Sequence, residues 1–202
     1  MLINFKFVIL DVDGTIFDSK KKYRKILKWM SDLGFNFLLN RFYSSMLDNN
    51  YSKSVYILKK KIYNLIYIFF ERINIEKPRT FKGVKTFLKE LKRKKIKIFA
   101  STNSSVIDTE EKMKQSDIFK FFELILGRES YKVNHISLFA KYLNIDLKEF
   151  CSQAIYIGDG PIDIMLAKRN GIYSIGITNT IGNKLLKELG ANKIIDKITK
   201  AC

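Results

Sequence analysis

Short apolar runs that end in small or polar residues recur along this chain. Helical spacing of apolar residues appears before or between the later runs, in VKTFLKELKRK, TEEKMKQSDIFKFF, HISLFAKYLNI and DIMLAKRNG. Apolar runs of this length, closed by turn-forming residues, predict buried β-strands. Strands that alternate with helices predict an α/β fold, in which helices cover both faces of a parallel sheet. The expected strands lie at about residues 5–11, 96–101, 123–126, 154–158 and 172–176.

The region from residue 18 to residue 77 breaks this alternation. It has no clear strand pattern, and its apolar residues recur at helical spacing. The longest expected helix carries one stripe of Val55, Leu58, Ile62, Leu65, Phe69 and Ile73 and a second of Tyr56, Tyr63, Tyr67 and Phe70. Packing is the simpler interpretation of the tyrosines. The pattern predicts an all-helical insertion at 18–77 in an α/β core formed by residues 1–17 and 78–202.

The composition is typical of a folded domain. Of the 202 residues, 47% are hydrophobic and 13% aromatic, which is enough for one good core. The longest uncharged apolar run in the middle of the chain, 62–70, is far shorter than the ~20 residues that span a bilayer. No targeting segment is recognisable, and the two cysteines suit neither a disulfide framework nor a metal site. We therefore expect a cytoplasmic protein without membrane contact, as a monomer or a homodimer.

The chain is strongly basic, with 37 Lys and Arg against 20 Asp and Glu and a formal charge of +17. The lysines are spread along the expected helices and accompany abundant Ile, Asn, Tyr and Phe. This distribution is typical of a compositional bias that leaves a basic, solvated surface. Electrostatic attraction of a phosphorylated substrate is the functional alternative.

Polar side chains follow the expected strands. Taken alone, the first two of these residues, Asp11 and Asp13, could belong to a solvated Asp-Gly turn. However, ligands of a parallel sheet bind outside the carboxyl ends of its strands, so we expect all these groups to converge there. Four carboxylates beside a lysine predict a hard divalent cation, and Mg²⁺ fits best. The groups are Asp11 and Asp13; Ser101, Thr102 and Asn103; Lys132; and Asp159 and Asp163.

These segments resemble a known family. Four of them resemble, in chain order, the four motifs of the haloacid dehalogenase-like (HAD) hydrolases. They are DVDGT, the strand-end TN, Lys132 and GDGPID. The segments DGTIFDS, FKGVKTFLKELK and IGDGPIDIMLAKRNGI extend the similarity over nearly the whole chain, to the phosphoglycolate phosphatase-like branch. The resemblance implies a Rossmann-like, three-layer core with an inserted helical cap.

The resemblance also implies residue roles. Asp11 would attack phosphorus and form an aspartyl-phosphate, and Asp13 would protonate the leaving oxygen and later activate water. Thr102 and Lys132 would complete the catalytic set by binding the phosphoryl group. The expected substrate-binding residues are Gly14, Thr15, Thr102, Asn103 and Lys132. The expected Mg²⁺ ligands are Asp11, the backbone carbonyl of Asp13, Asp159 and Asp163, the last directly, through water or through Lys132.

Some assignments within the motifs stay open. Ser101 competes with Thr102 as the phosphate-binding hydroxyl, and we prefer Thr102 because an asparagine follows it. The KVNH segment lacks the prolines common in the family, and Lys141 competes with Lys132. We prefer Lys132 because it precedes the expected helix. His135, the only histidine, is expected at the surface or at a helix cap.

The resulting hypothesis is an Mg²⁺-dependent phosphatase that hydrolyses a small phosphorylated metabolite, of the phosphoglycolate, sugar phosphate or nucleotide class. Asp13 argues against the dehalogenase branch, because halide needs no proton donor. A phosphomutase on the same core and a non-catalytic, basic nucleic-acid-binding module are the alternatives, and the second has little reason to keep the carboxylates. Arg24, Arg41 and the lysines at 20–22 could meet a second anionic group, although a solvated surface explains them more simply.

Overall fold

The core of the protein is a single parallel sheet of six strands in the order β3-β2-β1-β4-β5-β6. The structure, a computed structural model, describes residues 5–19, 21–37, 41, 44 and 79–201. The five predicted strands are confirmed to within two residues, and β6 was not predicted. The strands are β1 (Phe7–Asp11), β2 (Lys97–Ser101), β3 (Phe122–Leu126), β4 (Ala154–Gly158), β5 (Tyr173–Ile177) and β6 (Lys193–Ile195).

Helices connect these strands. The four predicted helical patterns of the core are present, but the one over residues 109–122 is interrupted. Helix α5 ends at Gln115, and Asp117 has a φ of 52°, so the chain turns before a short 3-10 segment begins. The helices are α1 (Lys21–Asp32), α4 (Val84–Arg93), α5 (Val106–Gln115), α6 (His135–Tyr142), α7 (Leu147–Gln153), α8 (Pro161–Arg169) and α9 (Asn183–Leu189). The 3-10 turns are η2 (Phe119–Phe121), η3 (Arg128–Ser130), η4 (Lys132–Asn134) and η5 (Ile198–Ala201).

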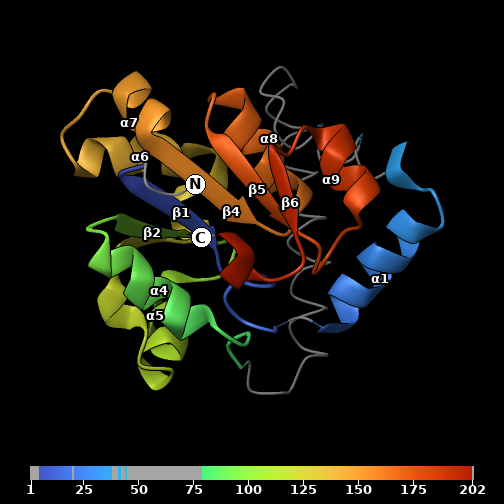
Figure 1. Cartoon of the computed structure of the whole chain (residues 1–202), viewed down its shortest axis with the longest axis horizontal. Helices are drawn as coiled ribbons and strands as arrows, with labels where there is room; N and C mark the ends of the chain where they lie inside the picture. The colour runs from blue at the N-terminus through green and yellow to red at the C-terminus, as the bar shows by residue number, and fades with distance from the viewer. Residues whose placement is uncertain (1–4, 20, 38–40, 42–43, 45–78, 202) are drawn as a thin grey trace.

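The two faces of β1 belong to two different cores because side chains alternate along a strand. Val8 and Leu10 pack in one buried cluster with Phe87 of α4. Phe7 and Ile9 pack in the other, with Phe139 of α6 and Phe150 of α7. Figure 1 shows α4 and α5 on one side of the sheet and α6, α7 and α8 on the other. The molecule is therefore the three-layer α/β structure that the pattern predicted.

The chain reverses its direction of travel across the sheet at β1. Strands β2 and β3 lie to one side of it, and β4, β5 and β6 lie to the other. The helices that follow β3 consequently cover the opposite face from α4 and α5. In such sheets the connections diverge at the reversal point and leave a crevice outside the carboxyl ends. Here that point is at Asp11, whose strand neighbours end at Ser101 and Gly158.

Two segments that are far apart in the chain meet at the edge of the core. The backbone N–H of Asp18 donates to the carbonyl of Arg79 over 2.8 Å, and the N–H of Phe81 donates to that of Ile16 over 2.9 Å. Residues 16–18 and 79–81 thus form a short antiparallel pairing, which we call the hinge ladder. The predicted cap boundaries fall beside it. The predicted stripes over residues 55–73 lie outside the described residues.

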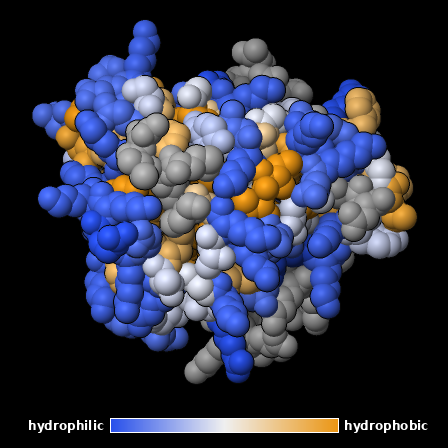
Figure 2. Space-filling view, viewed as in Figure 1, coloured by the Kyte–Doolittle hydropathy of each residue, from blue (hydrophilic) through white to orange (hydrophobic). Residues whose placement is uncertain are grey.

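Helix α1 follows the hinge ladder and packs on the core. Its Leu27 shares a buried cluster with Ile164 of α8 and with Leu185 and Leu186 of α9. No helix in the described part of the chain is both long and apolar enough to cross a bilayer. On the face drawn in Figure 2, hydrophilic residues dominate and the apolar ones form small, separate areas.

Candidate active site

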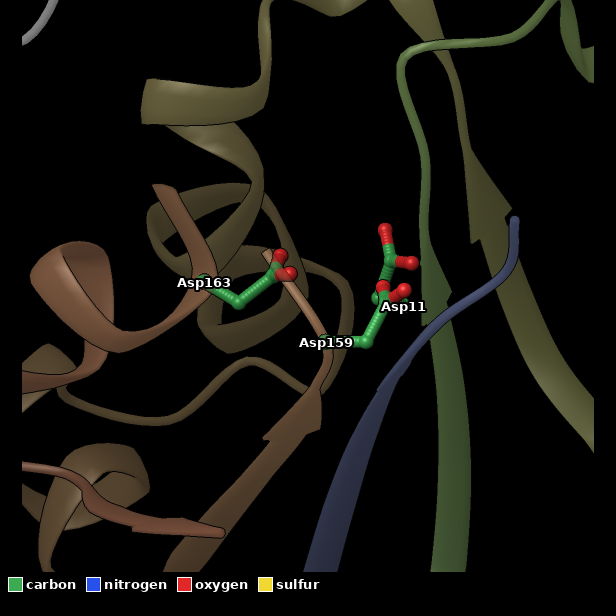
Figure 3. Close-up of side chains that lie close together, drawn as sticks. All are labelled: Asp11, Asp159 and Asp163. Atoms are coloured by element: carbon green, nitrogen blue, oxygen red, sulfur yellow. The ribbon is translucent and has the colours of Figure 1, made fainter. Parts of the chain in front are cut away.

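Three carboxylates meet at the reversal point of the sheet. Asp11 is the last residue of β1, Asp159 follows β4, and Asp163 lies in the first turn of α8. One oxygen from each lies within 4.8 Å of the others, and all three residues are buried. Figure 3 shows Asp163 pointing from α8 toward Asp11 and Asp159. We call these three residues the acidic cluster. It confirms the prediction that the segment ending in Asp11 meets the segment that carries Asp159 and Asp163.

Lys132 is the cation that meets this cluster. Its Nζ lies 2.6 Å from Oδ1 of Asp11 and 2.7 Å from Oδ1 of Asp163, and only 7% of the residue is exposed. The lysine enters from η4, directly after Tyr131, whose positive φ of 55° is uncommon for a bulky residue. Lys141, the competing candidate, is exposed on α6. The contacts therefore favour Lys132 over Lys141 as the lysine of the site.

Burial and the neighbouring charges shift the pKa values of the cluster. Burial raises the pKa of Asp11 well above its usual value; Lys132 opposes this increase, and the two other carboxylates add to it. Burial also raises the pKa of Asp159 to about 6, against a hydrogen bond from Thr180 that lowers it. Burial acts to lower the pKa of Lys132, but Asp11 and Asp163 outweigh it and raise that pKa well above its usual value. A bound cation would relieve this repulsion.

Hydroxyl groups hold the Asp159 side chain. Thr15 donates to Oδ1 over 3.3 Å, and Thr180 donates to Oδ2. Gly14, whose φ is 94°, fits against this carboxylate only because it has no side chain: a Cβ there would lie 1.9 Å from Oδ2 of Asp159. The predicted substrate-binding residues Gly14 and Thr15 thus lie directly against the acidic cluster. Asn179 donates to the Gly14 carbonyl over 2.7 Å and secures this turn.

Asp13 lies outside the acidic cluster and has its own partners. Its two carboxylate oxygens accept from Ser19 over 2.5 Å and from Ser104 over 2.6 Å. Ser19 follows the hinge ladder and Ser104 follows β2, so the carboxylate joins two segments of the chain. The side chain is not among the clustered carboxylates, so the predicted metal contact through its backbone carbonyl stays a prediction.

The two competing hydroxyls after β2 have different surroundings. The hydroxyl of Thr102 accepts from the backbone N–H of Ser104 over 3.0 Å. The hydroxyl of Ser101 is occupied by Tyr156 at 2.9 Å and by His135 Nδ1 at 2.8 Å. Ser101 is thus held by buried partners, and the geometry favours Thr102 as the phosphate-binding hydroxyl. Asn103, the third predicted residue here, is partly exposed.

Two expectations about polar residues near the site are wrong. His135 is not a surface residue: it is fully buried, because both ring nitrogens have partners in Ser101 and the Gly127 carbonyl. Arg24 is not a solvated surface residue either. It is 8% exposed, pairs with Asp18, donates to the Ser19 carbonyl over 2.7 Å and stacks on the ring of Phe81. Arg41 is exposed, as expected.

Sequence reasoning missed Thr180, Asn179 and Ser104. A signal existed for the first two, because TNT directly follows β5 and that strand ends at the same edge as β1 and β4. Ser104 follows the predicted strand-end TN by one residue. Its significance depends on the approach of Asp13, which is 91 positions away along the chain.

Comparison with known proteins identifies the class that this fold and site define. The haloacid dehalogenase-like hydrolase family model matches residues 8–177, so the chain belongs to that family. The predicted enzyme class is confirmed at the level of this hydrolase family.

Individual proteins are similar to this chain over most of its length. The chain is 25% identical over 191 residues, 87% of this chain and 85% of the relative, to a Clostridium perfringens protein that carries the name pyrophosphatase PpaX. A predicted phosphatase from Clostridium acetobutylicum superposes with a TM-score of 0.66 at 22% identity, covering 98% of this chain and 96% of that one. A predicted phosphoglycolate phosphatase from Haemophilus somnus gives 0.66 at 16% identity, with the same coverage. These structures show the shared fold.

Proposed function

We propose that this protein is an Mg²⁺-dependent phosphatase that hydrolyses a small phosphorylated metabolite through an aspartyl-phosphate on Asp11. The observation that carries the proposal is the contact of Asp11 with Lys132 inside a buried excess of carboxylates. Attack by an anionic carboxylate on a phosphate dianion is prohibitive unless positive charge screens both. The site provides one such charge and the oxygen donors for a second.

The donor set fits a hard divalent cation. Carboxylate oxygens are the protein ligands that Mg²⁺ prefers, and one buried ammonium does not balance three buried carboxylates. Asp11, Asp159 and Asp163, with the backbone carbonyl of Asp13, would hold the ion. Bound there, Mg²⁺ would supply charge neutralisation on the phosphoryl oxygens.

The first chemical step in this proposal uses two aspartates. A carboxylate oxygen of Asp11 forms a bond to phosphorus while the bond from phosphorus to the ester oxygen breaks. Asp13, protonated for this step, gives its proton to the leaving oxygen. The ammonium of Lys132 and the hydroxyl of Thr102 bind the phosphoryl oxygens.

The second step returns the enzyme to its starting state. Asp13 is now a carboxylate and takes a proton from water. The water oxygen attacks phosphorus, the bond from phosphorus to Asp11 breaks, and inorganic phosphate leaves with Asp13 protonated again. In a phosphomutase, an acceptor hydroxyl would replace water in this step.

We propose further that residues 18–77 form a helical cap that sets the choice of substrate. The support is the pairing of residues 16–18 with residues 79–81 in the hinge ladder, and the packing of α1 on α8 and α9. A cap of this kind excludes water when it closes. Replacing residues 20–77 with a short Gly/Ser loop should preserve turnover of small activated esters, raise KM and flatten the substrate profile. An unchanged profile would contradict the cap.

A phosphate-release screen tests the proposed function. It should use Mg²⁺, a generic aryl phosphate and a panel of phosphoglycolate, sugar phosphates, nucleotides and pyrophosphate. Chelation by EDTA should abolish release, and added Mg²⁺ should restore it. Full activity in the chelator would refute the proposal. Transfer of phosphate to a second hydroxyl without release would instead identify the mutase, and salt-sensitive nucleic-acid binding without turnover would identify the binding module.

A further inference from the structure

His135 occupies a buried position between two segments that build the site. Its Nδ1 lies 2.8 Å from the hydroxyl of Ser101 at the end of β2, and its Nε2 lies 3.0 Å from the carbonyl oxygen of Gly127 after β3. None of the ring is exposed. The ring touches none of the residues assigned to the chemistry, yet it lies three residues after Lys132.

The hydrogen-bond partners of the two ring nitrogens determine the tautomer of His135. A carbonyl oxygen can only accept, so Nε2 carries the proton and donates to Gly127. Nδ1 of the neutral ring then accepts from the Ser101 hydroxyl, which itself accepts from Tyr156 over 2.9 Å. Burial and the charge of Lys132 lower the pKa of His135 to about 3, although the Gly127 bond opposes this. The ring therefore stays neutral around pH 7, with every donor and acceptor assigned.

The bond from His135 to Gly127 closes the loop that delivers Lys132. Between these two residues lie η3, the positive φ of Tyr131, and Lys132 itself. A non-glycine residue in such a conformation costs about 1–3 kcal/mol and persists only where its surroundings hold it. The ring is one such support, because it joins both ends of the loop to the end of β2.

The first residue of this loop is itself fixed. A Cβ on Gly127 would lie 2.6 Å from the carbonyl oxygen of Ser104, and the N–H of Arg128 donates to that same oxygen over 3.0 Å. Ser104 in turn donates to Asp13. The anchor that His135 holds is therefore continuous with the residues around Asp13.

We propose that His135 is a positioning residue that, as the neutral Nε2–H tautomer, holds the Gly127–Lys132 loop so that Lys132 meets Asp11 and Asp163. The inference rests on the proposed function insofar as it concerns turnover. The ring acts through the loop and takes no part in proton transfer. A neutral side chain with one fixed donor suits this role, since a second buried cation beside Lys132 would destabilise it.

Kinetics of three variants test the role. His135→Ala removes the donor to Gly127, and we expect kcat on an aryl phosphate to fall by about 10- to 100-fold, as for a misplaced catalytic group. His135→Gln keeps a donor at this position and should recover most of kcat. Phe150→Leu is the matched control: it trims a fully buried ring of α7 in the apolar cluster that α7 shares with α6, and it should lower the melting temperature without the loss of kcat. Equal kcat values in His135→Ala and Phe150→Leu would overturn the proposal.

Nuclear magnetic resonance gives a readout that needs no substrate. Because His135 is the only histidine, its ¹⁵N signals in the labelled wild type are assigned without ambiguity. We expect the Nε2–H tautomer at pH 7, unchanged at pH 5; an Nδ1–H tautomer, or protonation with a midpoint near 6.5, would overturn the proposal. The Lys132 Nζ protons should be protected in the wild type and in His135→Gln and unprotected in His135→Ala. If the wild type turned over no phosphate ester, the proposed function would fail, and these signals would still decide the placement of Lys132.

Discussion

The acidic cluster and the hinge ladder lie near one another at the carboxyl edge of the sheet, but they differ in whether their charges are balanced. The acidic cluster holds three buried carboxylates, and Lys132 contacts two of them. In the hinge ladder, Asp18 pairs with Arg24, whose guanidinium also donates to a backbone carbonyl. Unbalanced buried charge is costly unless a ligand completes it. The comparison teaches that the acidic cluster carries a charge excess that suits a cation, whereas the charged pair at the hinge ladder is balanced within the chain.

Asp11 should give the largest effect of any residue in this comparison. Asp11→Asn replaces the nucleophile with an amide, so kcat should fall by about 10⁴-fold or more, as for other removed nucleophiles. No phosphoenzyme should be trapped on denaturation. Asp117→Asn, an exposed aspartate on the surface, is the control and should retain full activity. A trapped aspartyl-phosphate on the Asp11→Asn protein would contradict the assignment.

Asp13 should give a smaller loss with a different kinetic form. Asp13→Asn removes the acid and base, which typically contributes about 10²- to 10⁴-fold. With an activated aryl leaving group, the first step needs little protonation, so a burst of the aryl alcohol should precede slow steady-state turnover. Stopped-flow measurement of the burst checks this. Equal slowing of both phases would show that Asp13 does not separate the two steps.

Asp159 links the excess charge to stability. Its pKa of about 6 against a usual 3.8 corresponds to a cost of about 3 kcal/mol when the buried group is ionised. In EDTA at pH 7.5, Asp159→Asn should therefore be more stable than the wild type, while its phosphatase activity is lost. Mg²⁺ at about 100 times its Kd should stabilise the wild type by about 2.7 kcal/mol and the variant far less. Equal Mg²⁺ shifts of the two melting temperatures would contradict the ligand role.

The pH dependence has a definite sign. Because the folded-state pKa of Asp159 is raised, its favourable contribution is fully present below about pH 3.8 and is lost as pH rises through about 6. His135 acts in the opposite direction, since its lowered pKa of about 3 makes stability rise with pH up to about 6.5. The difference between the wild type and Asp159→Asn in EDTA cancels the His135 contribution and reports Asp159 together with its effect on Asp11. This difference should increase in favour of the variant between pH 5 and pH 7 in denaturant melts.

Arg24 tests the balanced side of the comparison and should give the smallest effect on chemistry. Arg24→Ala leaves Asp18 and the Ser19 carbonyl without this donor, so we expect a loss of about 1–3 kcal/mol in unfolding free energy. KM should rise more than kcat falls, because Asp11 and Lys132 are untouched. Arg93→Ala, an exposed arginine of α4, is the control. A loss of kcat as large as that of Asp13→Asn would show that the hinge takes part in the chemistry.

The sequence predicted the sheet and the acidic cluster because both follow from local patterns. Each strand is a short apolar run with a polar end, and the sheet rule then brings the ends together. Helices α7 and α9 and strand β6 were not predicted because they are short, although Asp146 followed by Glu149 is a capping signal for α7. The end of α5 at Gln115 was not predicted, because the helical spacing of apolar residues continues through the turn at Asp117.

Contacts between distant segments could not be read in the same way. Thr15 and Asp159 are 144 positions apart, and Ser101 and His135 are 34 apart. Such pairs depend on which strands are neighbours and on how the loops bend. The sequence gives only the residue type, and a polar residue is expected at the surface until a buried partner is known. His135 and Arg24 were misplaced for this reason.

The hinge ladder also has a consequence for the history of the chain. The entropy of closing a loop grows slowly with its length, by only about 0.6 kcal/mol for each doubling. Since residues 18 and 79 are already joined by a backbone hydrogen bond, changing the number of residues between α1 and residue 79 alters this closure entropy only slightly. Helix α1 itself places Leu27 in a buried cluster with α8 and α9, so its exchange would cost core packing. Under the proposed cap role, new substrates can therefore be acquired by insertions and deletions beyond α1, while the residues that perform the chemistry stay unchanged.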